Sequence, residues 1–387
     1  MPAVVLSELN RAAETRTMND VVHSRRQLLA LAVVSLIPKV VTNPWRLEFR
    51  MSNERLHQVF ICAAIAAALA TAVPFARAQA NGDALTDDLS RGQRFDLMLS
   101  DLAESPALTD VQRRQFAFPL QFAFPHDARF RDPLTETNPR SNQIFGIDLS
   151  HHNTDNCRCE IDWVILRRQD VQYAYLKVSQ GVKGFDPLFT TYRKGAKAVA
   201  EADRIPTGGY HFLSADGSAQ AQAANFVSRV GSIEASELPP VLDLEEDNRV
   251  GPDKKLILGP DGKRRDFWDT VPADEILSRA VAYLKAVEAA TGRAPIIYTN
   301  AQWWKTRIGD GSKIAAFGKY KVWTADYSRD GHKLEKPSVP GNAPWALWQF
   351  TSTARMTSGG VGKGQSVDAN VFNGTLQQFR VAMGVAP

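Results

Sequence analysis

From Ile144 onward, short apolar runs alternate with longer amphipathic stretches, and this alternation constrains the fold more than any other feature of the chain. Eight runs have the length and the β-branched or aromatic content of strands. They cover residues 144–150, 174–180, 206–213, 239–245, 294–300, 320–327, 346–353 and 367–372. Helical patterns lie between the first five runs, at 162–169, 187–203, 218–231 and 274–291. The last of these has acidic residues at its start and Gly292 as a stop signal.

Strand and helix alternation predicts a parallel sheet, and eight strands predict closure into a barrel. The last three runs lack long helical spacers, so we expect an incomplete helical ring. The sequence therefore predicts an α/β fold, a TIM-like barrel of the (β/α)5(β)3 kind, over residues 144–387. The Pro- and Gly-rich stretch 251–272 is predicted to be a long loop inserted after the fourth strand.

Residues 51–80 have the layout of a secretory signal peptide. They begin with Met, carry an apolar run at 59–73, and offer cleavage after Ala78 or Ala80. The apolar run is too short for a comfortable membrane span. We therefore expect an exported protein, periplasmic or extracellular, with no stable membrane insertion after cleavage.

Two further N-terminal segments complete the predicted organisation. Residues 1–50 contain a second export-like stretch, and we interpret them either as lying upstream of a true translation start at Met51 or as an additional leader. The alternative is that both apolar runs are membrane anchors. Residues 81–143 are predicted to be a partly disordered extension, in which the pentamer QFAFP occurs at 115–119 and again at 121–125. We expect these pentamers to drape over the main domain or to contact a partner.

The formal charge of +4 belongs to the leader. Residues 1–80 hold nine Lys/Arg against five Asp/Glu, and the remaining residues hold 37 of each sign. The basic balance is therefore no argument for a nucleic-acid partner, and none is expected.

Acidic residues stand late in several predicted strands or on end segments. In PPVLDLEE, at 239–246, Asp243 and Glu245 are two residues apart and share one face of a strand. Asp148 in GIDLS and Asp368 in VDANVF have comparable positions. Because barrel enzymes carry their chemistry at the C-terminal ends of the strands, closure would bring these four acids to one mouth.

Aromatic residues accompany the acids. Tyr210, Tyr298, Trp323 and Trp348 lie in the same strand ends. Aromatic faces pack on sugar rings, and carboxylates supply the proton transfers of glycosidic cleavage, so the combination indicates a carbohydrate site. Core packing is the alternative for each aromatic residue taken singly.

Histidine and cysteine residues suggest other kinds of site. His151 and His152, after Ser150, could indicate zinc or a catalytic triad, but adjacent histidines diverge in a strand, so we predict no metal and no cofactor. His211 is expected to form hydrogen bonds within the barrel mouth. The two cysteines of DNCRCEIDW could pair in an oxidising compartment, and we interpret them as a detail of a loop.

Nine motifs, in order along the chain, resemble the lysozymes of glycoside hydrolase family 25. The motifs are GIDLSHHN, IDW, FDPLF, GGYHF, PPVLDLEE, PIIYTN, VWTADY, LWQF and VDANVF, between residues 144 and 373. The resemblance implies an eight-stranded barrel with helices after the first five strands. It also implies a muramidase that cleaves peptidoglycan between N-acetylmuramic acid and N-acetylglucosamine.

The same resemblance implies roles for the acids. Glu245 matches the general acid, and Asp243 matches its partner, which acts as nucleophile or orients the 2-acetamido oxygen. Asp148 and Asp368 match the flanking acids. Acetamido assistance with retention is the outcome that we favour, and inversion stays open.

The sequence departs from the family pattern in its loops, with TDNCRCE after the first strand, SQG after the second and the long stretch 251–272. These departures affect the expected subsite preference. We predict an exported, monomeric muramidase that acts on peptidoglycan. Two alternatives stay open, a non-catalytic glycan-binding protein on the same barrel and a chitinase-like hydrolase.

Overall fold

The computed structural model describes Leu89 and residues 121–386, apart from 156, 254, 261, 263, 363 and 364. The predicted leader, the predicted signal peptide and the first QFAFP pentamer lie outside these residues. Among the residues described, none of the helices combines the length and the apolar character needed to cross a bilayer.

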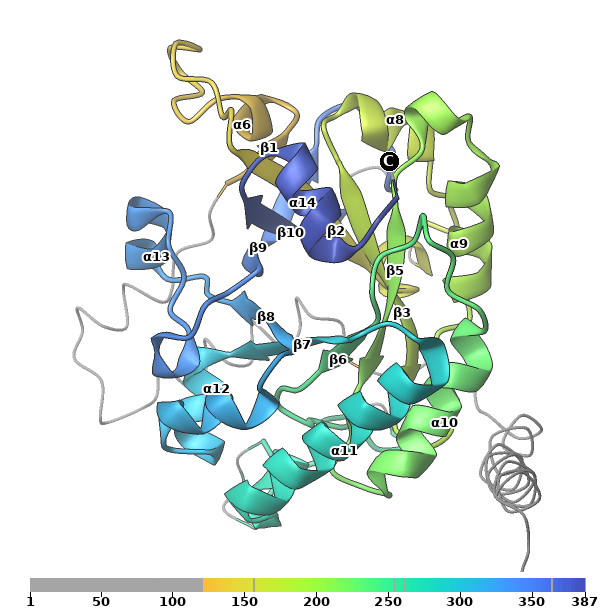
Figure 1. The fold of residues 1–387 in the computed structure, drawn as a ribbon, viewed down its shortest axis with the longest axis vertical. Coiled ribbons are helices and arrows are strands. Elements are labelled where there is room, and N and C mark those ends of the chain that lie inside the picture. The colour runs from red at the N-terminus through yellow and green to blue at the C-terminus, as the bar shows by residue number, and fades with distance from the viewer. Residues whose placement is uncertain are drawn as a thin grey trace, which may run out of the picture. The chain divides into compact units, whose positions relative to one another are not determined.

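Eight strands close into a barrel (Figure 1). They are β2 (Gln143–Leu149), β3 (Tyr173–Gln180), β5 (Thr207–Phe212), β6 (Val241–Asp243), β7 (Ile296–Asn300), β8 (Lys321–Ala325), β9 (Leu347–Met356) and β10 (Ser366–Asn373). Neighbours from β2 to β9 pair in parallel, whereas β10 is antiparallel to both β9 and β2. The predicted barrel is confirmed, with each of the eight apolar runs forming one strand.

Helices follow the first five barrel strands. They are α7 (His152–Asp155), α8 (Trp163–Arg168), α9 (Phe189–Ala198), α10 (Ala219–Val230), α11 (Ala273–Thr291) and α12 (Ala301–Arg307). The remaining barrel strands are joined by shorter elements, and the described part of the chain closes with a helix. These are η4 (Gly311–Phe317), α13 (Arg329–Leu334), η5 (Pro340–Asn342) and the final α14 (Leu376–Met383). The helical ring is therefore incomplete, as predicted.

Local sequence signals explain where these helices begin and end. The Asp162 side chain accepts a hydrogen bond from the Ile165 amide at the start of α8, and Ser218 caps α10 in the same way. At the end of α11, Gly292 has a left-handed backbone with φ of 68°, which glycine adopts without strain. Two further 3-10 turns, η2 (Glu201–Asp203) and η3 (Phe267–Thr270), lie in the connections.

Alternation along the strands divides the apolar residues into two cores. Phe145, Ile147 and Leu149 of β2 belong to the layer between barrel and helices. Inside the barrel lies a second cluster that includes Tyr173 and Val241. Gly146 of β2 leaves no room for a side chain, because a Cβ at this position would approach the Tyr173 ring to 2.4 Å.

The second QFAFP pentamer packs on the barrel. Its β1 (Ala123–Phe124) pairs in parallel with β9 and is followed by α6 (His126–Arg129), beside the barrel in Figure 1. Phe122 and Phe124 are buried against Phe145 and Phe350. A short β4 (Gly184–Phe185) extends the sheet at β3. Residues 121–125 are thus part of the same packed unit as the barrel.

Candidate active site

Three strands bring aspartates to one end of the barrel. Asp148 lies near the C-terminal end of β2, and Asp243 is the last residue of β6. Asp368 is near the start of β10, but this strand runs in the opposite direction, and the register places Asp368 opposite Asp148. The reversal of the last strand therefore carries its first residues to the end where the parallel strands finish.

Backbone pairing continues beyond β6 and fixes the direction of Glu245. The Leu213 amide donates to the Asp243 carbonyl at 2.9 Å, and the Leu244 amide donates to the Tyr298 carbonyl at 2.9 Å. Leu244 packs in the outer core, so the residues on either side of it face the barrel interior. Asp243 and Glu245 are 1% and 6% exposed. Asp243 and Glu245 are therefore both buried carboxylates at the end of β6, one on either side of Leu244.

Asp148 is the centre of a hydrogen-bond network. Its Oδ2 accepts hydrogen bonds from Gln349 Nε2 at 2.7 Å and from Asn370 Nδ2 at 2.8 Å. Gln349 Oε1 in turn accepts from the Tyr298 hydroxyl at 2.9 Å and from the Tyr327 hydroxyl. Two barrel strands, β9 and β10, thus hold the buried Asp148 carboxylate by charge-assisted hydrogen bonds, and Tyr298 of β7 supports Gln349 in turn.

Gln349 and Asn370 were missed in the sequence reading. Both stand inside motifs that were recognised, LWQF and VDANVF. The signal that could have found Asn370 is its spacing, since it is two residues after Asp368 and so shares its face of the strand.

Glu246 is a second titratable carboxyl beside Glu245. Burial, followed by the negative charges of Glu245 and Asp266, raises the pKa of Glu246 to about 7. Its Oε2 accepts a long hydrogen bond of 3.4 Å from Asn300 Nδ2 at the end of β7. Glu246 is thus a carboxyl that changes its charge near neutral pH.

Three of the predicted aromatic residues lie inside the barrel. Tyr210, Tyr298 and Trp323 belong to the interior cluster and are buried. The Trp323 ring lies 5.0 Å from the ring of Tyr298 and 5.1 Å from that of Tyr175, measured between centroids. These contacts pack the barrel interior and stabilise the strands that carry the acids.

Trp348 requires a correction, because its side chain is on the outer face of the barrel wall. It packs in the outer core against Phe350 and near His332, and its Nε1 donates to the Asp326 carbonyl at 2.8 Å. Its neighbour Gln349 has the interior position instead. The predicted place of Trp348 among the residues around the acids is therefore wrong.

His211 requires the same correction. Its ring stacks on Tyr283 of α11 at 5.0 Å, and its nitrogens contact Ser179 at 2.8 Å and Gln222 of α10 at 3.3 Å. These partners lie between the barrel and the helices. Burial lowers the pKa of His211 to about 3, so the ring is neutral. His211 supports the barrel wall and does not line the mouth.

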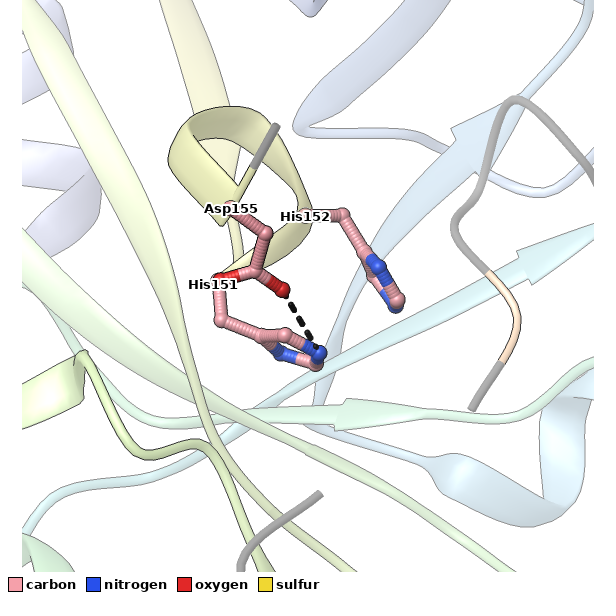
Figure 2. A group of neighbouring side chains, drawn as sticks. All are labelled: His151, His152 and Asp155. Carbon is pink, nitrogen blue, oxygen red and sulfur yellow. Dashed lines mark ion pairs between the residues drawn. The ribbon is translucent and has the colours of Figure 1, made fainter. Parts of the chain in front are cut away.

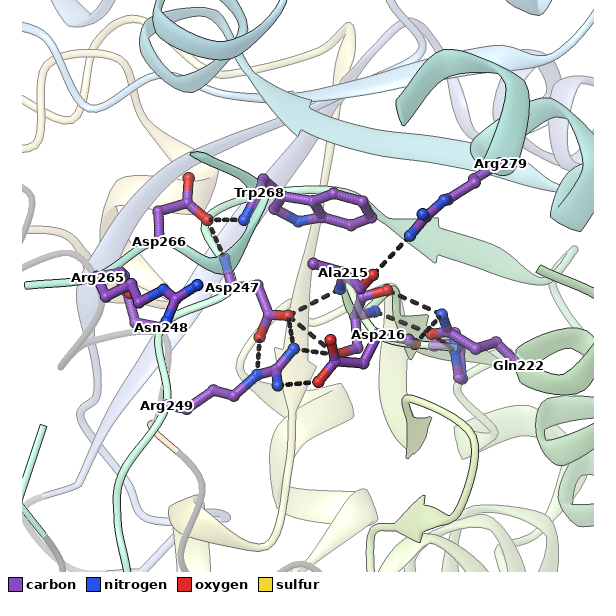
Figure 3. Close-up of polar contacts among 12 residues, drawn as sticks. Ala215, Asp216, Gln222, Asp247, Asn248, Arg249, Arg265, Asp266, Trp268 and Arg279 are labelled. Atoms are coloured by element: carbon purple, nitrogen blue, oxygen red, sulfur yellow. Dashed lines mark hydrogen bonds and ion pairs between the residues drawn. The ribbon is translucent and has the colours of Figure 1, made fainter. Parts of the chain in front are cut away.

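The loop after β6 is anchored by Asp247 (Figure 3). Asp247 Oδ2 accepts from Ser214 Oγ at 2.9 Å, from the Ala215 amide at 2.8 Å and from Arg249 Nη2 at 2.5 Å. Arg249 Nε also donates to Asp247 Oδ1 at 3.1 Å, and its guanidinium bonds to Asp216. A fully buried carboxylate here ties the loop after β6 to the loop after β5.

Asp266 anchors the other end of the long loop. Its Oδ1 accepts from the amides of Asp247 and Trp268 at 3.0 and 3.1 Å. Its Oδ2 accepts from Trp303 Nε1 at 3.1 Å and from Arg307 Nε at 2.6 Å. The predicted long loop is therefore held at both ends by buried aspartates, and it contains η3.

The histidine pair departs from the geometry that was predicted. β2 ends at Leu149, so His151 and His152 lie in a turn and at the start of α7 instead of in a strand. Their ring centroids are 4.0 Å apart, and the rings lie side by side with Asp155 (Figure 2). The argument that the two side chains diverge is therefore wrong.

Further along the same segment, Cys157 and Cys159 form a disulfide, which answers a question that the sequence left open.

A closed α/β barrel with several carboxylates gathered where its parallel strands end is the arrangement of a barrel glycoside hydrolase. The profile described as Glycosyl hydrolases family 25 matches residues 147–359. The chain belongs to this family. The match includes Asp148, Asp243 and Glu245, whereas Asp368 lies beyond its end.

Two relatives with known names agree with this assignment. Lysozyme M1 of Streptomyces globisporus is 30% identical over 240 residues, which are 61% of this chain and 70% of that protein. The N,O-diacetylmuramidase of Arthroderma benhamiae is 25% identical over 251 residues, 64% of this chain and 90% of that protein. A solved bacterial lysozyme from Streptomyces coelicolor is 28% identical, with a TM-score of 0.49, and covers 63% of this chain and 98% of its own.

Proposed function

We propose that this chain is an exported lysozyme that hydrolyses the β-1,4 bonds between N-acetylmuramic acid and N-acetylglucosamine in peptidoglycan. The observation that carries the proposal is the pair Asp243 and Glu245, buried on one face at the end of β6, in a chain of glycosyl hydrolases family 25. The lysozyme and muramidase relatives support the same substrate.

Within this proposal, Glu245 is the general acid and base. It protonates the leaving glycosidic oxygen, and after the first step it takes a proton from the attacking water. Its Oε1 is buried and accepts no hydrogen bond from the described part of the chain, which suits a group that must exchange its proton with substrate.

Asp243 assists Glu245 from two residues earlier on the same face. The glycosidic transition state carries positive charge at the anomeric carbon, and a nearby carboxylate stabilises this charge. Asp148 and Asp368 flank the pair. Asp148 is held still by Gln349 and Asn370, and a fixed negative charge costs little reorganisation when the positive charge develops.

Export is part of the proposal. It is supported by the predicted signal peptide at 51–80 and by the disulfide between Cys157 and Cys159, since disulfides persist in oxidising compartments. We propose that the mature protein acts as a monomer in the periplasm or outside the cell.

The test is to incubate the purified protein with peptidoglycan and to identify the new sugar ends by mass spectrometry after borohydride reduction. Reduced muramic acid ends from the wild type, and none from Glu245→Gln, are the expected result. Reduced glucosamine ends would show that another bond is cleaved. Binding to peptidoglycan without any new reducing ends would contradict the enzymatic function and favour a non-catalytic glycan-binding protein.

A further inference from the structure

Three side chains that can ligate a metal converge after the first barrel strand (Figure 2). They are His151, His152 and Asp155, and one ligand atom from each lies within 4.8 Å of the others. His151 Nε2 is 3.5 Å from Asp155 Oδ2. His151 and Asp155 are four residues apart on one turn, so their side chains share a face. None of these three residues is among the acids that carry the proposed reaction.

A buried carboxylate orients the first of these ligands. Asp186 Oδ2 accepts from the His151 amide at 2.8 Å and lies 3.0 Å from His151 Nδ1. The side chains of both residues are 1% exposed. A carboxylate only accepts, so Nδ1 carries a proton, and in the neutral form of the ring the lone pair would be at Nε2, on the side of Asp155. This carboxylate and histidine pairing typically fixes the tautomer and orientation of a metal-binding histidine.

We propose that His151, His152 and Asp155 bind a divalent transition metal ion, with Zn²⁺ as the best-suited probe. Two imidazoles and one carboxylate are a ligand set that zinc accepts, with the fourth position left to water or another ligand. Imidazole nitrogen disfavours Mg²⁺ and Ca²⁺, which take oxygen ligands. His151 is buried, His152 half-buried and Asp155 exposed, so the site is open to solvent on one side.

A doubly protonated His151 between Asp155 and Asp186 is the competing explanation. It accounts for the two carboxylates near this ring. In that arrangement the His152 ring, whose centroid lies 4.0 Å from that of His151, would be a stacking partner of the cation, whereas a metal ion would use it as a ligand. A metal ion accounts for the ligand atoms of both rings and of Asp155 lying within 4.8 Å of one another.

The experiment is calorimetric titration of the chelator-treated full chain with Zn²⁺ at pH 7.5, with Mg²⁺ as a parallel titrant. We expect one equivalent of Zn²⁺ to bind and Mg²⁺ to give no saturable signal. His152→Ala and Asp155→Asn should each weaken Zn²⁺ binding about tenfold or more. The matched control is His126→Ala, which removes a surface histidine that is 2.8 Å from Glu136, and it should leave the affinity unchanged.

A second measurement needs no variant. The stripped wild type is titrated with Co²⁺, and we expect visible absorption bands that disappear when Zn²⁺ is added. Absence of these bands together with absence of saturable Zn²⁺ binding would overturn the proposal. Unchanged Zn²⁺ affinity in folded His152→Ala and Asp155→Asn would also overturn it, because binding would then be elsewhere.

Discussion

Glu245 and Asp247 are two residues apart and similarly buried, yet their surroundings differ completely. Asp247 accepts hydrogen bonds from a hydroxyl, a backbone amide and a guanidinium, so both of its oxygens have donors. Glu245 has a buried Oε1 that accepts no hydrogen bond from the residues described. The Asp247 carboxylate thus anchors the loop after β6, whereas Glu245 has an oxygen that can bind a ligand.

The difference shows how one short acidic segment divides between structure and chemistry. A buried carboxylate whose oxygens accept hydrogen bonds from several donors is held in one position. A buried carboxylate oxygen without such donors can instead form a hydrogen bond with a bound ligand. Four predictions test this division.

The largest effect is expected for Glu245→Gln. The substitution keeps size and polarity but removes the proton, so kcat should fall about 10²–10⁴-fold while the unfolding transition stays in place. Release of reducing ends from peptidoglycan measures kcat, and Glu246→Gln is the neighbouring control that should keep most of the activity. A near wild-type kcat in Glu245→Gln would contradict the role of Glu245 as general acid and base.

Asp247→Asn should act on stability instead. It leaves Arg249 without its buried charge partner, and the free energy of unfolding should fall by about 2–3 kcal/mol, since the Arg249 side chain is 24% exposed and water compensates in part. Urea denaturation measures the change, and kcat of the folded protein should stay near the wild-type value. A large loss of kcat without a loss of stability would place Asp247 in the chemistry.

Glu246 should make stability depend on pH. Its pKa is about 7 in the folded protein, against an ordinary value of 4.5, so the folded state holds a proton that the unfolded state has lost. The free energy of unfolding should therefore fall as pH rises from 4.5 to 7, and this contribution is fully lost above about pH 7. In Glu246→Gln that part of the slope should disappear. Denaturation of both proteins at pH 5 and pH 8 checks this, and parallel slopes would contradict it.

The smallest effect is expected for Phe267→Leu. Arg249 lies 3.9 Å and Arg265 lies 4.4 Å from the centre of the Phe267 ring, and both cation–π contacts would be lost. We expect a loss of about 1 kcal/mol in the free energy of unfolding and no change in kcat. Thermal unfolding followed by circular dichroism is sufficient, and an effect as large as that of Asp247→Asn would mean that the ring, and not the carboxylate, anchors the loop.

The barrel could be predicted because each strand is marked by its own residues. Eight apolar runs, Gly292 at the end of α11 and the missing helices late in the chain all have local causes. The burial of Asp243 and Glu245 at the end of β6 also has a local cause, since both follow the apolar run that forms this strand.

The errors arose where position depends on which face of a strand is inside. Tyr210 and His211 are consecutive, so only one can point inward, and the same holds for Trp348 and Gln349. The residues that anchor the long loop, Asp247 and Asp266, could not be predicted from the sequence either. Asp247 accepts a hydrogen bond from Ser214, which is 33 residues earlier in the sequence, and no local pattern predicts a pair so far apart.

The reversed last strand also determines when the site can exist during folding. Asp148 and its donor Asn370 are separated by 222 residues, and they meet only when β10 enters between β9 and β2. Contacts of such long sequence separation form late, because the loop between them must first be closed at an entropic cost. A chain with its first seven barrel strands already paired would still lack Asp368 and Asn370. The rate at which activity appears during refolding should therefore report the rate at which β10 closes the barrel.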